Sequence, residues 1–328
     1  MSKDNVSKES LFNEVKGSLF EFLVGKNLAV INGEEKEYLE GIDRNYLNVL
    51  SQQDRMVRQF YPEMSSFLIK CARDTVISIK NGLKEDPRKP RLMGKLVNTL
   101  DKQDWHEADL IVETSSGPRP VSLKLNKKGA FVNTKSGGIK SFLSQYFSFL
   151  PSNHQTSFNQ LVDMEFEIMS RELHELAGIE YDGNYKSWVQ AGLSELPGEV
   201  SAPMREALKA YYARLALALH GHLSAALELD AEKFRESLFP LAGFSSRDIL
   251  QVVCFHDFKN QDGATEIFLH DAKEITDEVE IIPFHQTASA EVKVGLWTLQ
   301  IRIKPMNKFT TTAIKINCSV KVKQSSEA

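Results

Sequence analysis

Hydrophobic and polar residues alternate along two short runs, residues 108–113 and 121–126, which are separated by a stretch rich in Ser, Gly and Pro. Alternation at a period of two is typical of β-strands, and the composition between the runs is typical of a turn. We therefore predict a β-hairpin over residues 108–126. One face of this hairpin is expected to be hydrophobic throughout and consists of Ala108, Leu110, Val112, Val121, Leu123 and Leu125.

The other face of the predicted hairpin is mainly polar and charged. If the turn is centred between Ser116 and Gly117, Asp109 lies directly across from Lys124. Neighbouring strands are about 5 Å apart, so this carboxylate and this ammonium group could act on the same chemical group. The remaining residues of this face are Ile111, Glu113, Ser122 and Asn126.

Longer segments repeat their hydrophobic residues every three or four positions, which is typical of helices that bury one face. In the first of them Ser10 is a candidate N-cap, and in the second the Tyr61-Pro62 pair is expected to interrupt the helix. The predicted helical segments are residues 10–31, 44–83, 139–150 and 158–240.

Strand patterns return in the last part of the chain, most clearly at residues 295–304 and 313–322. A short strand is also predicted at residues 130–133, followed by a loop at residues 134–138 that contains two glycines. The stretch 84–91, with its two prolines, is expected to be a connector.

This order of elements predicts an α+β fold with an α/β core, in which a central mixed sheet is flanked by helices. A helical insertion and a C-terminal β region would complete it. The expected divisions are a core at residues 1–155 that includes the hairpin, a helical region at residues 156–245, and a β region at residues 246–328.

The composition is that of an ordinary globular protein, with 42% hydrophobic and 26% charged residues among 328. No hydrophobic run reaches membrane-spanning length, and the first residues lack the apolar core of a secretory signal. Cys71, Cys254 and Cys318 are too far apart to form a disulfide framework or a zinc motif, which favours buried thiols in a cytoplasmic protein.

The net charge of −4 hides an uneven distribution of the charged residues. No acidic residue occurs in residues 114–162 or in residues 292–326. A protein that separates its charges in this way can carry a cationic surface on an acidic body. The basic residues of the two windows are Arg119, Lys124, Lys127, Lys128, Lys135 and Lys140, and then Lys293, Arg302, Lys304, Lys308, Lys315, Lys321 and Lys323.

A carboxylate beside a lysine is suited to metal-dependent phosphodiester hydrolysis. The carboxylate binds Mg²⁺, which stabilises the charge that develops on the phosphate and lowers the pKa of a bound water. The lysine orients or deprotonates that water. Because Mg²⁺ keeps several of its own waters, few protein ligands are needed.

At these residues the chain resembles the PD-(D/E)xK superfamily, the restriction-endonuclease-like nucleases. That family has an acid on one strand of a hairpin and an acid-x-lysine triplet on the next, beside an N-terminal helix that often supplies a glutamate. By this resemblance Asp109 is the first acid, Lys124 is the lysine, and the main-chain carbonyl of Leu123 is a metal ligand. The resemblance implies Mg²⁺ as cofactor and covers roughly residues 10–150.

Two positions depart from the family pattern. Residue 108 is alanine where the family has proline, and Ser122 stands where the family usually has a second acid. Some members carry that carboxylate on another element. Glu21, which lies in a hydrophobic run of the first predicted helix, is the expected substitute and would bind Mg²⁺ together with Asp109, while Ser122 would hydrogen-bond a metal-bound water.

Basic and polar residues near the hairpin and near the end of the chain are the expected nucleic-acid contacts. Glycines before the predicted helix at 139 would leave its first N–H groups free for a phosphate. On the later strand, arginine and asparagine suit base edges and lysine suits phosphates. The expected contacts are Lys127, Lys128, Asn133, Lys135, Ser136 and Lys140, and then Arg302, Lys304, Asn307 and Lys308.

The sequence thus leads us to expect a Mg²⁺-dependent endonuclease that cuts double-stranded DNA, of the type II restriction kind. The resemblance implies a 5′-phosphate product, a two-fold homodimer if the target is a palindrome, and a cognate DNA methyltransferase in the same system. Two alternatives stay open. One is a nucleic-acid-binding protein of the same fold that does not cut, and the other is an interaction scaffold whose helical middle contacts a protein partner.

Overall fold

A computed structural model describes residues 3–83, 85–93, 108–127, 132–244, 249–256, 265–271, 278–295 and 297–322. The chain forms two compact units, each with its own five-stranded sheet. The first consists of residues 1–132 and 244–274, and the second of residues 133–243 and 275–328. The predicted α+β class is confirmed, because helices and sheets are both extensive and the first sheet is mixed.

The expected division at residue 155 falls inside the second unit, whereas the one at residue 245 lies two residues from the unit boundary after Gly243. The predicted C-terminal β region contributes strands to both units. Strand pairing between segments that are distant in the sequence causes this difference, and no local pattern encodes it.

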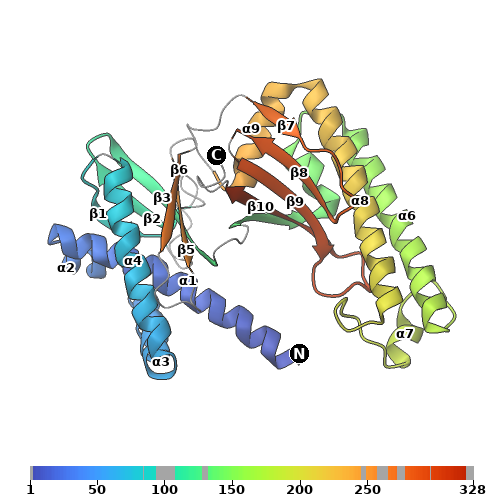
Figure 1. Ribbon diagram of the computed structural model, residues 1–328, viewed down its shortest axis with the longest axis horizontal. Helices are drawn as coiled ribbons and strands as arrows, with labels where there is room; N and C mark the ends of the chain where they lie inside the picture. Colours follow the sequence, from blue (N-terminus) through green and yellow to red (C-terminus); the bar gives the residue numbers. More distant parts are fainter. Residues whose placement is uncertain are drawn as a thin grey trace. The chain divides into compact units, whose positions relative to one another are not determined.

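The first unit begins with helices and continues with its sheet (Figure 1). Its strands have the order β1-β2-β3-β5-β6, in which β3 and β5 are parallel and the other neighbours are antiparallel. The elements are α1 (Lys3–Asn32), α2 (Glu35–Glu40), α3 (Arg44–Phe60), α4 (Pro62–Leu83), β1 (Arg88–Leu92), β2 (Leu110–Thr114), β3 (Gly117–Lys127), β5 (Leu250–His256) and β6 (Glu266–Asp271).

The predicted helices of this unit are confirmed, including the interruption between α3 and α4 at Tyr61-Pro62. The N-cap prediction is wrong, because α1 begins at Lys3 and Ser10 lies inside the helix. Asp43 caps α3, because its carboxylate accepts hydrogen bonds from the N–H groups of Asn45 and Tyr46. The predicted connector at residues 84–91 contains most of β1 instead. β1 is an edge strand, where Pro90 removes no hydrogen bond that the sheet needs.

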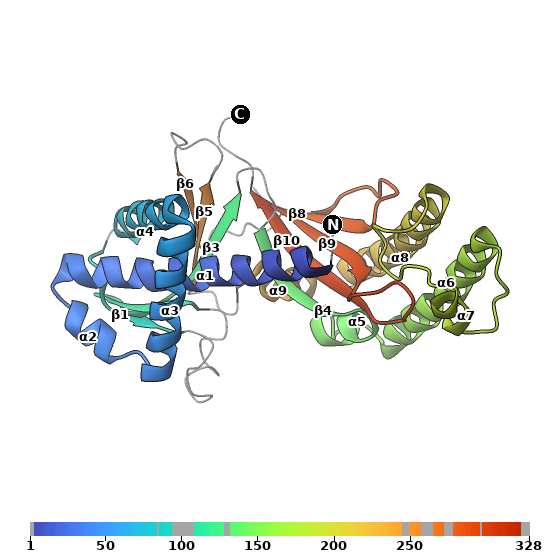
Figure 2. The ribbon, with the colours of Figure 1, turned by 90° about the horizontal axis from the view of Figure 1, so that it is seen from below.

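The core of the first unit lies between its sheet and its helices. The hydrophobic face of the hairpin, with Leu110, Val121 and Leu123, belongs to one buried cluster with Val24 and Leu28 of α1. α1 also packs alongside α4 (Figures 1 and 2). The predicted division of the hairpin into two faces is therefore correct.

The register of the hairpin differs from the prediction by two residues. Thr114 pairs with Gly117 and Leu110 pairs with Val121, so the turn is centred between Ser115 and Ser116. Ser122 therefore takes the place across from Asp109 that was predicted for Lys124. Because a shift of two residues preserves the face of every side chain, Lys124 is displaced along the strand but stays on the same side.

The second unit has an antiparallel sheet with the strand order β4-β10-β9-β8-β7. Helices α8 and α9 contact strands of this sheet, and α8 also packs against α6. The elements are β4 (Val132–Gly138), the 3₁₀ helix η1 (Ile139–Ser141), α5 (Phe142–Tyr146), α6 (Ser152–Ala177), α7 (Lys186–Gln190), α8 (Ala202–Leu229), α9 (Ala231–Ala242), β7 (Val279–Ile281), β8 (Ser289–Val294), β9 (Trp297–Pro305) and β10 (Ile314–Val322).

Two local predictions for this unit are wrong. Residues 134–138 are part of β4 and not a loop, because pairing with the sheet outweighs the local preference of the glycines. The predicted helix at residues 139–150 is reduced to a 3₁₀ turn and the five-residue α5. The helical prediction for residues 158–240 is divided into α6, α7, α8 and α9.

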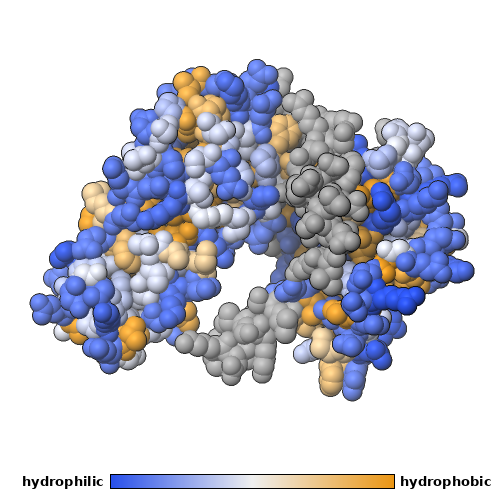
Figure 3. Space-filling model, turned by 180° about the vertical axis from the view of Figure 1, so that it is seen from behind, coloured by the Kyte–Doolittle hydropathy of each residue, from blue (hydrophilic) through white to orange (hydrophobic). Residues whose placement is uncertain are grey.

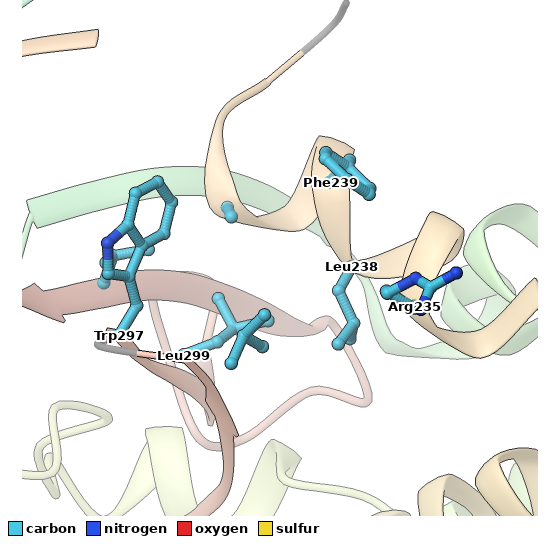
Figure 4. Close-up of a pocket in the computed structure, with 8 residues that line it drawn as sticks. Arg235, Leu238, Phe239, Trp297 and Leu299 are labelled. Atoms are coloured by element: carbon cyan, nitrogen blue, oxygen red, sulfur yellow. The ribbon is translucent and has the colours of Figure 1, made fainter. Parts of the chain in front are cut away.

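A small cavity lies where α9 packs on this sheet (Figure 4). Its volume, measured as the space open to the centre of a water molecule, is about 10 Å³. It is lined by Leu238 and Phe239 of α9 and by Trp297 and Leu299 of β9. A buried water needs two to four polar partners, whereas this lining is hydrophobic apart from Arg235. The cavity is therefore a dry packing gap and not a ligand site.

The hydrophobic residues lie mainly inside the two units. One face of the molecule is mostly hydrophilic, with hydrophobic residues in separate patches (Figure 3). None of the helices in the described ranges is both long and apolar enough to cross a lipid bilayer.

Candidate active site

Asp109 directly precedes the first residue of β2, and its carboxylate contacts three residues of the neighbouring strand β3. Its Oδ2 atom accepts a hydrogen bond from the Leu123 N–H at 2.6 Å and one from the Ser122 hydroxyl at 3.4 Å. The Lys124 ammonium lies 3.7 Å from the same oxygen. The predicted meeting of Asp109 and Lys124 is therefore present, diagonally across the two strands.

The hydrogen bond from Leu123 explains why the carboxylate is held here. The pairing of β2 with β3 ends at Leu110 and Val121, so the Leu123 N–H has no β2 carbonyl across from it. The side chain of Asp109 replaces that acceptor, and a charge-assisted bond of this kind is stronger than a neutral one. The site is thus fixed by the main chain of β3.

The groups around Asp109 do not fully compensate the charge of its carboxylate. The side chain is 22% exposed and that of Lys124 is 30% exposed, so the pair is partly withdrawn from water. Burial raises the pKa of the Asp109 carboxyl above its ordinary value, although Lys124, Leu123 and Ser122 act in the opposite direction. The negative charge is therefore incompletely compensated by the side chains around it.

Glu21 is carried by α1, which packs against β3. Its charge raises the pKa of the Tyr46 hydroxyl, and so does that of Asp109, after the larger effect of burial. Both carboxylates therefore lie in the electrostatic neighbourhood of one tyrosine. The role of Glu21 as a metal ligand stays a prediction.

Tyr46 was not recognised from the sequence. It is a buried residue of α3, and Ser18 of α1 acts to lower the pKa of its hydroxyl against the larger effect of burial. In the sequence it is one of several hydrophobic positions on that helix. The only available signal was that a tyrosine, whose hydroxyl needs a partner when buried, stands at a position expected to be buried.

The residues present fit a Mg²⁺ ion. The Asp109 contacts among the described residues all go to Oδ2, and the undercompensated charge of the carboxylate favours a cation. Glu21 and the Leu123 carbonyl would add two more hard oxygen ligands. Within the described ranges, no group of three or more Asp, Glu, His or Cys side chains is arranged to hold a metal. Waters would have to complete the coordination.

Arg302 and Lys304 lie on the same face of β9, as predicted, because the alternating residues Ile301 and Ile303 are buried on the other face. Lys315 of β10 is paired with Lys304. Burial, and then the charges of Lys315 and Arg302, lower the pKa of Lys304. We refer to Arg302, Lys304 and Lys315 as the cationic face.

The remaining predicted contacts are dispersed. The Ser136 hydroxyl donates to Asn317 Oδ1 at 3.0 Å, whereas the charge of the adjacent Lys135 acts on the thiol of Cys318. Successive strand residues point to opposite faces, so the two cannot form the phosphate-binding loop that was expected. α5 is also too short to provide the expected helix N-terminus.

Two of the predicted lysines are already paired with acids. Lys140 forms an ion pair with Asp163 at 2.6 Å, and Lys308 forms one with Glu195. Asn307 is exposed next to Lys308, Asn133 is exposed on β4, and Lys127 is exposed at the end of β3. Lys128 lies outside the described residues.

Comparisons with protein-family models, with curated proteins and with solved structures return no match for this chain.

Proposed function

We propose that the protein is a Mg²⁺-dependent endonuclease that hydrolyses phosphodiester bonds in double-stranded DNA. The observation that carries the proposal is the group formed by Asp109, Lys124 and the Leu123 main chain on β2 and β3. Its carboxylate is held 3.7 Å from an ammonium group and is undercompensated in charge. The resemblance to the PD-(D/E)xK nucleases gives the same residues the same roles.

Each residue has a defined task in this proposal. Asp109, Glu21 and the Leu123 carbonyl would hold Mg²⁺, which supplies charge stabilisation at the phosphate and a bound water of lowered pKa. Lys124 positions that water and neutralises a non-bridging phosphate oxygen. Ser122 is 1% exposed and donates to Asp109, so it orients the carboxylate.

The cationic face of the second unit supports DNA as the substrate. Arg302, Lys304 and Lys315 repel one another, and none of them forms an ion pair with a carboxylate of the described residues. Phosphates would relieve this repulsion, and the arginine beside Lys304 could also reach a base edge. A sequence-specific enzyme of the type II restriction kind would use such a surface. We propose a two-fold homodimer for a palindromic target and a cognate methyltransferase as partner.

One observation favours a second candidate, a nucleic-acid-binding protein that does not cut. Ser122 is buried in the place where a second acid is expected, and Asp109 already has a structural task as acceptor for Leu123. Such a protein would still bind nucleic acid through the cationic face but would not hydrolyse the phosphodiester bond.

Incubation of supercoiled plasmid with the protein and Mg²⁺ tests the proposal, with EDTA as the first control. We expect strand scission that EDTA abolishes. Lys124→Ala should reduce the rate by roughly 10²–10⁴-fold, because a proton-transfer or water-positioning group is lost. Lys70→Ala removes an exposed lysine of α4 and should leave the rate unchanged. Absence of Mg²⁺-dependent scission with retained DNA binding would favour the second candidate.

A further inference from the structure

Strand β1 borders the candidate active site on the side away from β3. In the first sheet β2 lies between these two strands (Figure 1). The contact with β1 continues one residue past the end of that strand, where the N–H of Met93 donates to the main-chain carbonyl of Asp109 at 2.9 Å. The main chain therefore fixes the position of β1 relative to Asp109.

Arg91 of β1 lies on the face of the sheet that carries Asp109 and Lys124. Arg91 is paired with Ile111 of β2, and residues directly opposite each other in an antiparallel pair share a face. Ile111 is two residues from Asp109, so these two also share a face. The neighbouring Leu92 agrees with this assignment, because it belongs to the buried cluster on the other face of the sheet.

Arg91 and Lys124 occupy corresponding positions on opposite sides of Asp109. Lys124 is displaced from Asp109 by one strand and two residues, and Arg91 by one strand and two residues in the opposite direction. Such diagonal neighbours are about 7–8 Å apart, a distance that long side chains can span. Lys124 does span it, since its ammonium lies 3.7 Å from the carboxylate. The three residues thus form a row in which the carboxylate stands between two cations.

The two cations of this row differ in their partners. Lys124 is paired with Asp109, whereas Arg91 is exposed and forms no ion pair with a carboxylate of the described residues. Arg88, on the same strand, is paired with Asp86 at 3.3 Å. The row therefore carries two positive charges and one negative charge before a metal binds, which favours a polyanion over a neutral ligand.

A charged residue on an edge strand can also prevent pairing with a strand of another molecule. β1 already has two features that serve this purpose. Pro90 lacks an N–H group, and the register shifts between Arg88 and Arg91. Edge protection therefore does not account for an arginine on the face of Asp109.

We propose that Arg91 binds the phosphate next to the phosphodiester bond that Asp109 and Lys124 act on. The proposal rests on the proposed nuclease function for the identity of the ligand. A guanidinium presents two parallel N–H groups to two oxygens of one phosphate, which an ammonium cannot do. Arg91 is a substrate-binding residue that holds the DNA backbone in place over Asp109, while Lys124 acts at the bond that is cut.

The first test is the binding of a fluorescently labelled DNA duplex at several salt concentrations, with Ca²⁺ in place of Mg²⁺. We expect Arg91→Ala to reduce the slope of log K against log salt by about 0.9 and the affinity by roughly three- to tenfold. Arg91→Lys keeps the charge and should preserve the slope, with a lower affinity because the planar fork is lost. Arg73→Ala removes an exposed arginine of α4, which packs on the other face of the sheet, and should change nothing.

Cleavage kinetics separate this role from that of Lys124. A contact that is made equally in the bound substrate and in the transition state affects KM and not kcat. We expect Arg91→Ala to raise KM and to leave kcat nearly unchanged, whereas Lys124→Ala lowers kcat. Thermal unfolding of Arg91→Ala should match that of the unsubstituted protein, because the exposed side chain has no acidic partner to lose.

Three results would overturn the proposal. The first is an unchanged salt slope and affinity for Arg91→Ala, and the second is an equal loss of affinity for Arg73→Ala. The third is self-association of Arg91→Ala with unchanged DNA binding, which would assign Arg91 to edge protection.

The two proposals fail in different ways. If the protein cuts DNA through Lys124 while Arg91→Ala binds and cuts normally, the Arg91 proposal is wrong and the nuclease proposal stands. If Arg91 sets the salt slope in a protein that never cuts, the nuclease proposal is wrong and Arg91 still binds a phosphate.

Discussion

The two sheets of this protein use positive charge differently. In the first, Lys124 is 30% exposed and faces a carboxylate that the main chain holds in place. In the second, Arg302, Lys304 and Lys315 gather on a sheet face with one another as neighbours. The first arrangement pairs a single lysine with a carboxylate, whereas the second places three cations side by side without a carboxylate partner among the described residues. Acid-free stretches of sequence can therefore lead to two distinct kinds of site.

The largest expected effect in this comparison comes from Asp109→Asn. The amide oxygen can still accept the Leu123 N–H, so the hairpin should remain folded, while a charged metal ligand is lost. We expect cleavage to fall by at least roughly 10³-fold. DNA binding measured with Ca²⁺ in place of Mg²⁺, together with its salt dependence, should barely change. A variant that cuts normally would show that Asp109 has only its structural task.

The pH dependence of the unsubstituted protein sharpens this result. Burial raises the pKa of Asp109 in the folded state, so the ionised carboxyl destabilises the protein above the unfolded pKa of about 3.9. Stability should therefore fall as the pH rises through the interval between the unfolded and the folded pKa, and Mg²⁺ should offset that loss. Cleavage should disappear as the pH falls through the folded pKa. Thermal unfolding with and without Mg²⁺ measures the first effect, and Asp109→Asn should remove it.

A medium effect is expected from the double substitution Arg302→Ala and Lys304→Ala. Each phosphate contact contributes about 0.9 to the slope of log K against log salt, so the slope should decrease by about 2 and the affinity by roughly tenfold. The cleavage rate of DNA that is already bound should be unaffected. Titrations at several salt concentrations provide the measurement, and Lys186→Ala, at an exposed lysine of α7, is the matched control. An unchanged slope would exclude the cationic face as a DNA contact.

The smallest effect is expected at a histidine pair within the helices of the second unit. Nδ1 of His154 lies 3.1 Å from Nδ1 of His222, so one ring donates and the other accepts. Burial, and then His154, lower the pKa of His222. The neutral pair therefore stabilises the protein above the unfolded pKa of about 6.5, and this contribution is lost as the pH falls through the folded pKa of His222.

His222→Leu tests this interpretation. Stability should lose part of its dependence on pH below neutrality, by less than about 1 kcal/mol, because one full pKa unit corresponds to about 1.4 kcal/mol. Chemical denaturation at a series of pH values gives the measurement, and His285→Ala, an exposed histidine, is the control. Identical pH profiles for His222→Leu and the unsubstituted protein would contradict it.

The faces of the hairpin could be predicted from the sequence, but its register could not. Alternation reports only which side a residue faces, so Asp109 and Lys124 were assigned to the correct side under a turn placed one residue too late. The turn is held at Ser115 and Ser116 by Glu85, which accepts both hydroxyl groups at 2.8 Å. These hydrogen bonds lower the pKa of Glu85 to about 2. Glu85 and Ser115 are 30 residues apart, so no local sequence pattern indicates this contact.

The same limit applies to the other differences. Residues 134–138 have the composition of a loop, and they form a strand because the sheet supplies the partner. Tyr46 looks like an ordinary core position in the sequence, although the charges of Glu21 and Asp109 both raise the pKa of its hydroxyl in the folded chain. Helices with a clear hydrophobic period, such as α3 and α4, were predicted well because their pattern is local.

The parallel pairing of β3 with β5 has a consequence for how the protein is made. Residues 128–249 separate these neighbours, and the ribosome needs roughly 6–24 s to add them at about 5–20 residues per second. During that interval the strand that carries Lys124 has an unfilled edge, which other chains or a chaperone can reach. The first sheet can therefore be completed only after a segment that belongs mainly to the other unit has been translated.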